Sequence, residues 1–118
     1  YNGATRLGYN VVIEQQNRTA DSVQMRVVWT NTLSKNHYYG YTQKFNATLG
    51  GVGAGEVTIA NASLWNNSAN HDRSQTAYSG WVTVPLNTTN KTTVYVGGRY
   101  WSATTDQGWS GTVTVPAY

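Results

Sequence analysis

The sequence contains no cysteine among its 118 residues. This absence excludes disulfides, thiolate zinc sites and cysteine nucleophiles, although it says little about the redox compartment. Charged residues are also scarce, at 11% of the chain, where soluble domains usually have roughly 25%. Hydroxyl and amide groups must therefore solvate the surface, a composition that is frequent on extracellular and virion proteins, which often meet sugars.

Basic patches and long apolar runs are missing as well. The formal net charge is +3, but no two Lys or Arg residues are adjacent, so the pI of about 9.3 reflects a scarcity of acids. Nucleic-acid binding is therefore not expected. No apolar stretch approaches the roughly 20 residues of a membrane-spanning helix, so membrane insertion is not expected either.

The length predicts one domain over residues 1–118, enough to bury a core without disulfides or metal. The N-terminus lacks the charged and apolar regions of a signal peptide, and the chain starts at Tyr1 without an initiator methionine. We therefore expect a processed chain or a domain excised from a longer protein.

The sequence does contain strand character, with no convincing helical periodicity. Aromatic and β-branched runs in the C-terminal third end at Pro85 and Pro116, which cannot donate to a β-ladder. Turn-forming Asn, Asp, Ser and Gly residues separate the runs, and the glycine-rich stretch 49–55 is predicted as one such loop. The seven predicted strands are 7–15, 22–32, 38–49, 55–62, 76–84, 92–101 and 108–115.

Alternation with a period of two assigns faces to these strands. In segment 22–32, Val23, Met25, Val27 and Trp29 fall on one face, so Trp29 is predicted in the core. Trp81 of segment 76–84 is predicted there too. Segment 92–101 also alternates, with Val94, Val96, Gly98 and Tyr100 opposite Tyr95, Gly97, Arg99 and Trp101.

Seven short strands in this length predict an all-β fold, a seven-stranded antiparallel β-sandwich of the immunoglobulin or fibronectin type III kind. A jelly roll is the alternative. The usual immunoglobulin cysteine pair is absent, so the core must rest on the packing of aromatic and Val side chains.

Three stretches carry longer motifs. They are Val-x-Met-x-Val-Val-Trp at 23–29, Tyr-x-Gln-x-Phe-x-Ala-x-Leu-Gly-Gly at 41–51, and Gly-Trp-Val-Thr-Val at 80–84 followed by Asn-Thr-Thr-Asn-Lys-Thr-Thr-Val-Tyr-Val at 87–96. This pattern resembles a domain of phage minor structural and tail proteins and covers most of the chain. The chain departs from that family at 86–92, where the His-Asn-x-Asp-Gly turn is missing. The resemblance implies a virion-associated, immunoglobulin-like module that is either structural or host-glycan-binding.

The residues do not form a catalytic apparatus. His71, Asp72 and Ser74 are the residue types of a hydrolytic triad, but neighbouring loop positions point in different directions and are predicted as a solvated turn. Glycoside hydrolysis needs paired carboxylates, and only Asp72 and Asp106 lie on long loops beside aromatics. We therefore expect no enzyme activity.

A metal site is not expected either. Asn66, Asn67, Asn70 and Asp72 place several oxygens on one loop, yet a single carboxylate provides little charge for calcium. We predict that these side chains bond their own backbone, and that the protein uses no metal and no cofactor.

Aromatic residues, in contrast, are abundant. Five Trp and nine Tyr exceed what one small core can hold. A saccharide presents apolar C–H faces ringed by hydroxyls, so its receptor needs aromatic platforms beside amide, carboxylate or guanidinium groups. The predicted carbohydrate-binding residues are Trp65, Trp101, Trp109, Asp106, Gln107 and Arg99, with Tyr38 and Tyr39 as weaker candidates. Alternatively, these rings close the open ends of the sandwich or stack on the arginine.

Two functions follow as hypotheses. The first is a non-catalytic structural module of a phage particle, in the tail or as a capsid decoration, that contacts other virion subunits and contributes adhesion to host cell-surface glycans. The second is a carbohydrate-binding module that uses the loop aromatics, of phage or secreted bacterial origin. Both predict a virion or extracellular location.

Overall fold

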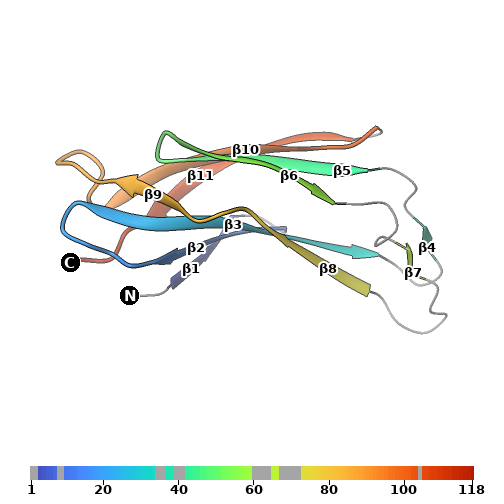
Figure 1. The fold of residues 1–118 in the computed structure, drawn as a ribbon, viewed down its shortest axis with the longest axis horizontal. Helices are drawn as coiled ribbons and strands as arrows, with labels where there is room; N and C mark the ends of the chain where they lie inside the picture. Colours follow the sequence, from blue (N-terminus) through green and yellow to red (C-terminus); the bar gives the residue numbers. More distant parts are fainter. Residues whose placement is uncertain are drawn as a thin grey trace.

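A computed structural model of the chain describes residues 3–7, 10–33, 37–38, 42–59, 65–66, 73–103 and 105–118. These described residues form antiparallel β-sheets and contain no helix. The two larger sheets lie face to face in an elongated molecule of 51 × 26 × 19 Å (Figure 1). The all-β prediction is therefore confirmed.

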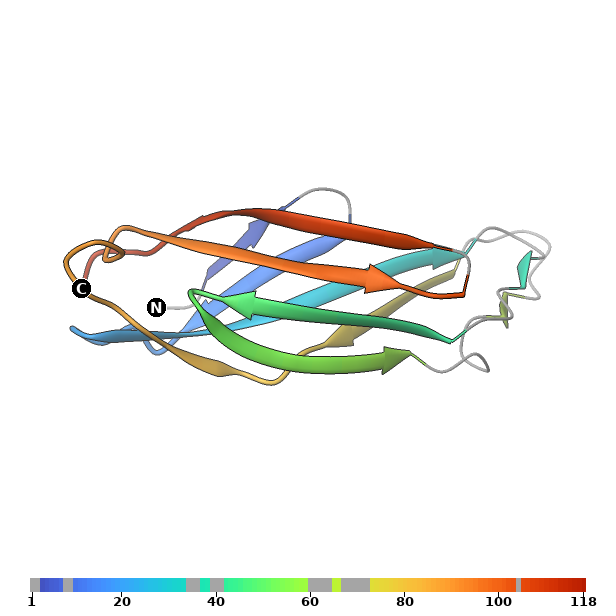
Figure 2. The ribbon, with the colours of Figure 1, turned by 90° about the horizontal axis from the view of Figure 1, so that it is seen from above.

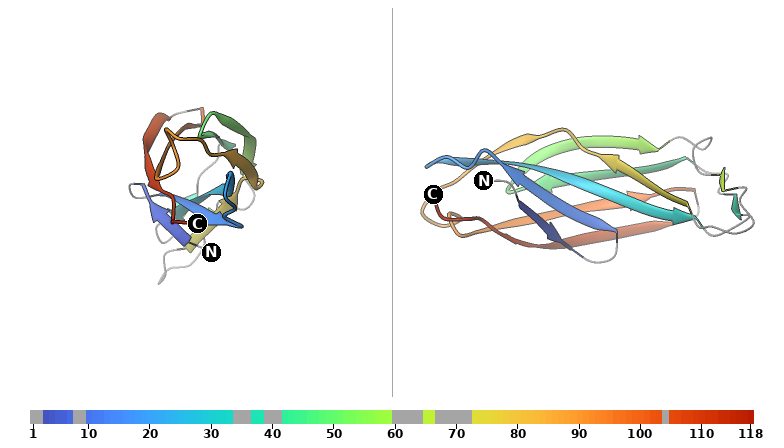
Figure 3. Two further views of the ribbon diagram at one scale, coloured as in Figure 1. Left: turned by 90° about the vertical axis from the view of Figure 1, so that its left-hand side faces the viewer. Right: turned by 90° about the horizontal axis from the view of Figure 1, so that it is seen from below.

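One layer is a five-stranded sheet. Its strands are β1 (Gly3–Arg6), β2 (Val11–Gln16), β3 (Ser22–Leu33), β8 (Arg73–Tyr78) and β9 (Val82–Pro85). The first three are successive antiparallel neighbours, and β3 is long enough to pair with both β8 and β9 along its other side. Figure 3 shows this layer from below, with β3 extending along most of the molecule.

The other layer is a four-stranded sheet in the order β11-β10-β5-β6 (Figure 2). Its strands are β5 (Gln43–Leu49), β6 (Val52–Ile59), β10 (Thr93–Trp101) and β11 (Asp106–Thr114). Gly50 and Gly51, with φ of 58° and 82°, form the two-residue turn that joins β5 to β6. A turn with two positive φ angles matches the twist of the flanking strands. A small pair, β4 (His37–Tyr38) with β7 (Trp65–Asn66), lies at one end of the molecule.

The two larger sheets contain nine strands, whereas seven were predicted for the whole chain. The predicted segment 7–15 misses β1, because the Leu7 amide donates to the Val11 carbonyl and turns the chain between β1 and β2. The segment 76–84 divides into β8 and β9. Strand β6 begins at Val52, so only Gly50 and Gly51 of the predicted loop 49–55 form the turn. Segment 38–49 begins at the last residue of β4 and contains β5, with residues 39–41 outside the described part.

The core lies between the inner faces of the two sheets. Trp29 is 3% exposed and stacks on Tyr100 at 4.7 Å and on Phe45 at 6.0 Å between ring centroids. The Tyr100 hydroxyl donates to Oε1 of Gln43, so both buried polar groups are paired. The other buried apolar residues are Val11, Ile13, Val23, Met25, Val27, Ala47, Leu49, Ile59, Val84, Leu86, Val94, Val96, Val113 and Val115. Aromatic and Val packing therefore forms the core, and the prediction for Trp29 is confirmed.

Candidate functional site

The β10–β11 hairpin gathers Arg99, Trp101 and Asp106 from the predicted set. Its register pairs Trp101 with Asp106 and Arg99 with Gly108. Residues paired directly across two antiparallel strands point to the same face, and so do residues two apart on one strand. Because Val94, Val96 and Tyr100 occupy the inner face of β10, this cluster lies on the outer face.

The Arg99 side chain is fixed by two contacts. Its Nε and Nη2 donate to the two carboxylate oxygens of Asp106, each at 2.7 Å. Its Cζ lies 4.7 Å from the centroid of the Trp101 ring. A bidentate pair of this kind sets the plane of the guanidinium group as well as its position. The pair is open to solvent, with side chains 50% and 61% exposed for Arg99 and Asp106.

The electrostatics of the pair keep both groups charged at neutral pH. The hydrogen bonds from Arg99 lower the pKa of Asp106, loss of hydration opposes that shift, and the arginine charge adds to it. The pKa of Arg99 is raised in turn, first by the same hydrogen bonds. The unused Nη1 group remains a donor, and the carboxylate oxygens retain lone pairs. A polar ligand would therefore meet both donors and acceptors.

The neighbouring strand β5 extends this surface. The register places Asn46 beside Arg99 and Lys44 beside Trp101. Oδ1 of Asn46 accepts from the Arg99 backbone N–H at 3.0 Å, and Lys44 is within 3.1 Å of Glu56 on β6. We call Lys44, Asn46, Arg99, Trp101 and Asp106 the Trp101 patch.

Gln107 and Trp109 lie on the opposite, inner face of the same hairpin. The Trp109 ring covers Gly98, its cross-strand partner, and packs against the core. Both residues line a cavity of about 200 Å³ together with Leu7, Asn10, Val11, Trp29 and Gly108. The Trp109 indole N–H is buried there and has no acceptor among the described residues. The sheet therefore separates this ring from Trp101, which the sequence grouped with it.

Several predicted positions fall outside the described part of the chain. Trp65 lies in β7, where it pairs with Tyr38 of β4, so its backbone is in a short strand and not in the predicted loop. The side chains of both residues are outside the described part. So are the residues Tyr39, Asn67, Asn70, His71 and Asp72 and the side chain of Asn66.

A second aromatic cluster was missed in the sequence because Trp81 was predicted in the core. The Arg26 guanidinium lies 4.5 Å from the Tyr78 ring centroid and 4.6 Å from that of Trp81. Trp81 is half-buried against the outer face of the five-stranded sheet, and Tyr78 is 51% exposed. The core prediction for Trp81 is therefore wrong. Ser79 and Gly80, just before it, were the available sign of a break in the strand.

Across the described residues, no three His, Cys, Asp or Glu side chains lie close enough together to hold a metal ion. The same part of the chain has no helix that is long and apolar enough to cross a membrane.

Three comparisons, with protein-family models, with curated proteins and with solved structures, found no match to this chain.

Proposed function

We propose that this chain is a non-catalytic module of a phage particle, in the tail or as a capsid decoration, and that it binds host-surface glycans through the Trp101 patch. The observation that carries the proposal is the convergence of Trp101, Arg99 and Asp106 on one solvent-exposed face. The sequence motifs at 23–29, 41–51 and 80–96 support the phage assignment through their resemblance to phage structural proteins.

The patch has the chemistry that a sugar requires. Trp101 offers an indole to the apolar C–H face of a pyranose, and Arg99 and Asp106 offer a donor and acceptors to its hydroxyls. Since Arg99 lies over one face of the half-buried Trp101 ring, the sugar would stack on the opposite face. The fixed guanidinium needs little ordering when a ligand binds, which favours affinity.

A glycan array with the purified chain tests the proposal. Trp101→Ala removes the platform, and we expect it to weaken binding about tenfold, because loss of about 1.4 kcal/mol is a factor of ten. Tyr95→Ala is the matched control, since Tyr95 is on the same strand and the same face and is 66% exposed. Absence of any array signal from folded protein, or equal binding by the Trp101→Ala chain, would reject the Trp101 patch.

The finer fold type is part of the same proposal. We infer an immunoglobulin-like sandwich from the strand order. β2, β3 and the β8–β9 pair correspond to strands A, B and E of that fold, and β11-β10-β5-β6 corresponds to its G-F-C-C′ sheet. Many surface-displayed domains use this architecture to present a face or an edge to a partner.

A second function, assembly with other virion subunits, is favoured by the edge strand β11. Among the described residues it pairs only with β10, and it has no charged residue after Asp106. The opposite edge, β6, carries Glu56 and a register shift near Gly55, whose φ is 79°. Charges and bulges protect an edge from pairing, so β11 is the edge left open to a neighbouring strand.

Thr112→Lys, on the outer face of β11, tests the assembly role. We expect fewer copies of the chain per particle, counted by quantitative mass spectrometry, because edge lysines oppose strand addition. Thr48→Lys is the control, since Thr48 is exposed on the same outer face but on the inner strand β5. Equal incorporation of the two variants would argue against docking at β11.

A further inference from the structure

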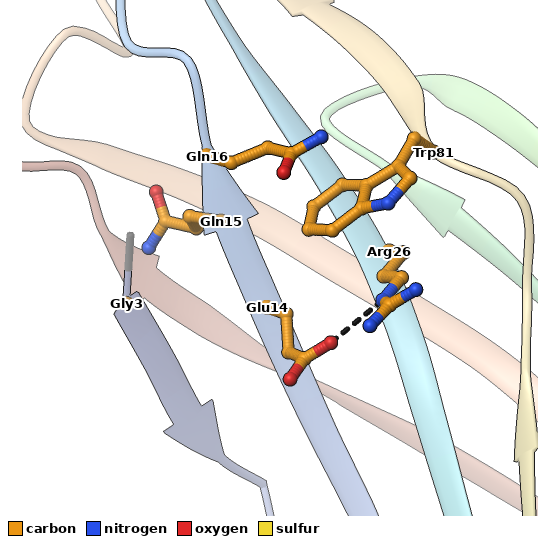
Figure 4. A pocket seen from close by; sticks show the side chains of 6 residues that line it. All are labelled: Gly3, Glu14, Gln15, Gln16, Arg26 and Trp81. Atoms are coloured by element: carbon orange, nitrogen blue, oxygen red, sulfur yellow. Dashed lines mark hydrogen bonds and ion pairs between the residues drawn. The ribbon is translucent and has the colours of Figure 1, made fainter. Parts of the chain in front are cut away.

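A cavity of about 170 Å³ lies over β1, β2 and β3, beside the chain before β9. It is lined by Gly3, Glu14, Gln15, Gln16, Arg26 and Trp81 (Figure 4). These residues belong to the five-stranded sheet and its β8–β9 connection, so the cavity is separate from the Trp101 patch on the other sheet. None of the residues was predicted as a ligand-binding residue from the sequence.

The walls of this cavity are fixed. Arg26 Nε donates to Glu14 Oε1 at 2.6 Å, and both side chains are only about one-third exposed. The Trp81 ring lies 4.6 Å from the Arg26 guanidinium carbon and extends toward Gln16 (Figure 4). An aromatic ring held by a paired arginine is a rigid platform.

The cavity also has unused hydrogen-bond acceptors on its Trp81 side. Nε2 of Gln16 donates to Gln24, which leaves Gln16 Oε1 as one acceptor. The second carboxylate oxygen of Glu14 is another. Gln15 directs its side chain to the inner face of β2, where its Nε2 donates to the Thr114 carbonyl and its Oε1 is buried.

From these contacts we infer that the cavity is a binding site for a neutral saccharide. One pyranose ring stacks on Trp81, and its hydroxyls donate to Gln16 Oε1 and Glu14. The Glu14–Arg26 pair has no net charge. The carboxylate would repel an anionic ligand and the guanidinium would repel a cationic one, so a neutral ligand is favoured. The cavity is open on its outer side, so a longer saccharide would extend from it into solvent.

Titration of the ¹⁵N-labelled chain with chitotriose, maltotriose and cellotriose tests this inference, with the indole N–H signals followed by NMR. Trp81→Phe assigns the Trp81 signal. We expect at least one sugar to move that signal saturably, with a Kd on the order of 1 mM, as for one sugar ring on one platform. No movement with any of the three sugars up to about 10 mM would overturn the inference.

Two variants separate this site from its surroundings. Trp81→Ala and Gln16→Met should each weaken binding at least about fivefold, because they remove the platform and one acceptor. Near-ultraviolet circular dichroism of the buried Trp29 stack confirms that each variant is folded. Tyr95→Ala, at an exposed position of the other sheet, should move the Trp81 signal as the parent does. The Trp81 signal reports this cavity and the array with Trp101→Ala reports the Trp101 patch, so failure of one site is distinguishable from failure of the other. Undiminished binding by Trp81→Ala, or tighter binding of galacturonic acid, would count against the site.

Discussion

Gly98 lies where the Trp109 ring crosses β10, and the close approach leaves no room for a side chain. A Cβ at this position would lie 2.5 Å from Trp109 Cζ2 and closer still to the Asn46 carbonyl oxygen. Because relieving this overlap requires the backbone of Asn46 to move, we expect Gly98→Ala to lower the free energy of unfolding by about 1–3 kcal/mol or more. Urea unfolding measures this. Gly53→Ala, in a strand with open space around it, is the control and should change stability little.

The Arg99–Asp106 pair predicts a pH dependence at the level of single groups. The pKa of Asp106 lies below its ordinary value of 3.8 in the folded chain. A lowered folded-state pKa means that the contribution of the pair to stability is present above pH 3.8 and is lost as the pH falls through the folded pKa. Since both groups are exposed, we expect that contribution to be small.

Carboxyl-carbon NMR from about pH 6 to about pH 2 tests this shift directly. We expect Asp106 to titrate below 3.8 in the parent and to move up toward that value in Arg99→Gln. Lys44→Gln removes the other ion pair of the same face and should leave the Asp106 curve in place. An unchanged curve in Arg99→Gln would mean that the bidentate contact does not form in solution.

At the scale of elements, the connection between β8 and β9 decides which way Trp81 points. Tyr78 pairs with Val28, and Val82 pairs with Met25. The segment between Tyr78 and Val82 therefore has one residue more than the segment of β3 between Met25 and Val28. An extra residue reverses the alternation of side chains. Ala77 and Ser79 face inward before the bulge, and Val82 and Val84 do so after it. Trp81 is consequently directed outward.

Ser79 holds this bulge in place and gives the next prediction. Its Oγ accepts from the Val27 N–H at 2.8 Å, and its own N–H donates to the Val27 carbonyl. Ser79→Ala leaves the buried Val27 N–H unpaired, which should cost about 1–3 kcal/mol in thermal or urea unfolding. Ser110→Ala, at an exposed position on β11, is the matched control. Equal effects of the two variants would show that the hydroxyl is not needed at the bulge.

The sequence predicted which face a side chain occupies where apolar and polar residues alternate without interruption along a strand. It misled where one extra residue reverses that alternation. Strands β3 and β10 have clean alternation, and the faces of Trp29, Arg99 and Trp101 were predicted from it. The face of Trp81 was not, because Ser79 and Gly80 signal a break in the strand but do not show that β8 and β9 pair with β3 in registers one residue apart. The grouping of Trp101 with Trp109 likewise failed, since proximity in a hairpin does not reveal that the two rings lie on opposite faces.

At the scale of the whole molecule, polar contacts tie the two sheets together at the C-terminal end. Gln15 Nε2 on β2 donates to the Thr114 carbonyl on β11, and Arg18 Nε donates to the Pro116 carbonyl. These contacts join the five-stranded sheet, with the Trp81 cavity, to the four-stranded sheet, with the Trp101 patch. The two proposed sites therefore belong to one rigid sandwich and face away from each other.

That arrangement predicts crosslinking. A flat glycan surface can contact only one outer face of this sandwich at a time, so two surfaces are needed to occupy both sites. We expect the parent chain to agglutinate beads that carry the array ligand of the Trp101 patch together with the neutral trisaccharide that moves the Trp81 signal. Trp101→Ala and Trp81→Ala should each still bind the beads through the remaining site yet fail to agglutinate them, whereas Tyr95→Ala should behave as the parent does. Agglutination by either single-site variant would contradict this prediction, because it would require a further contact between two copies of the chain. Adding Thr112→Lys to that variant would then test whether the contact is made at the open edge of β11.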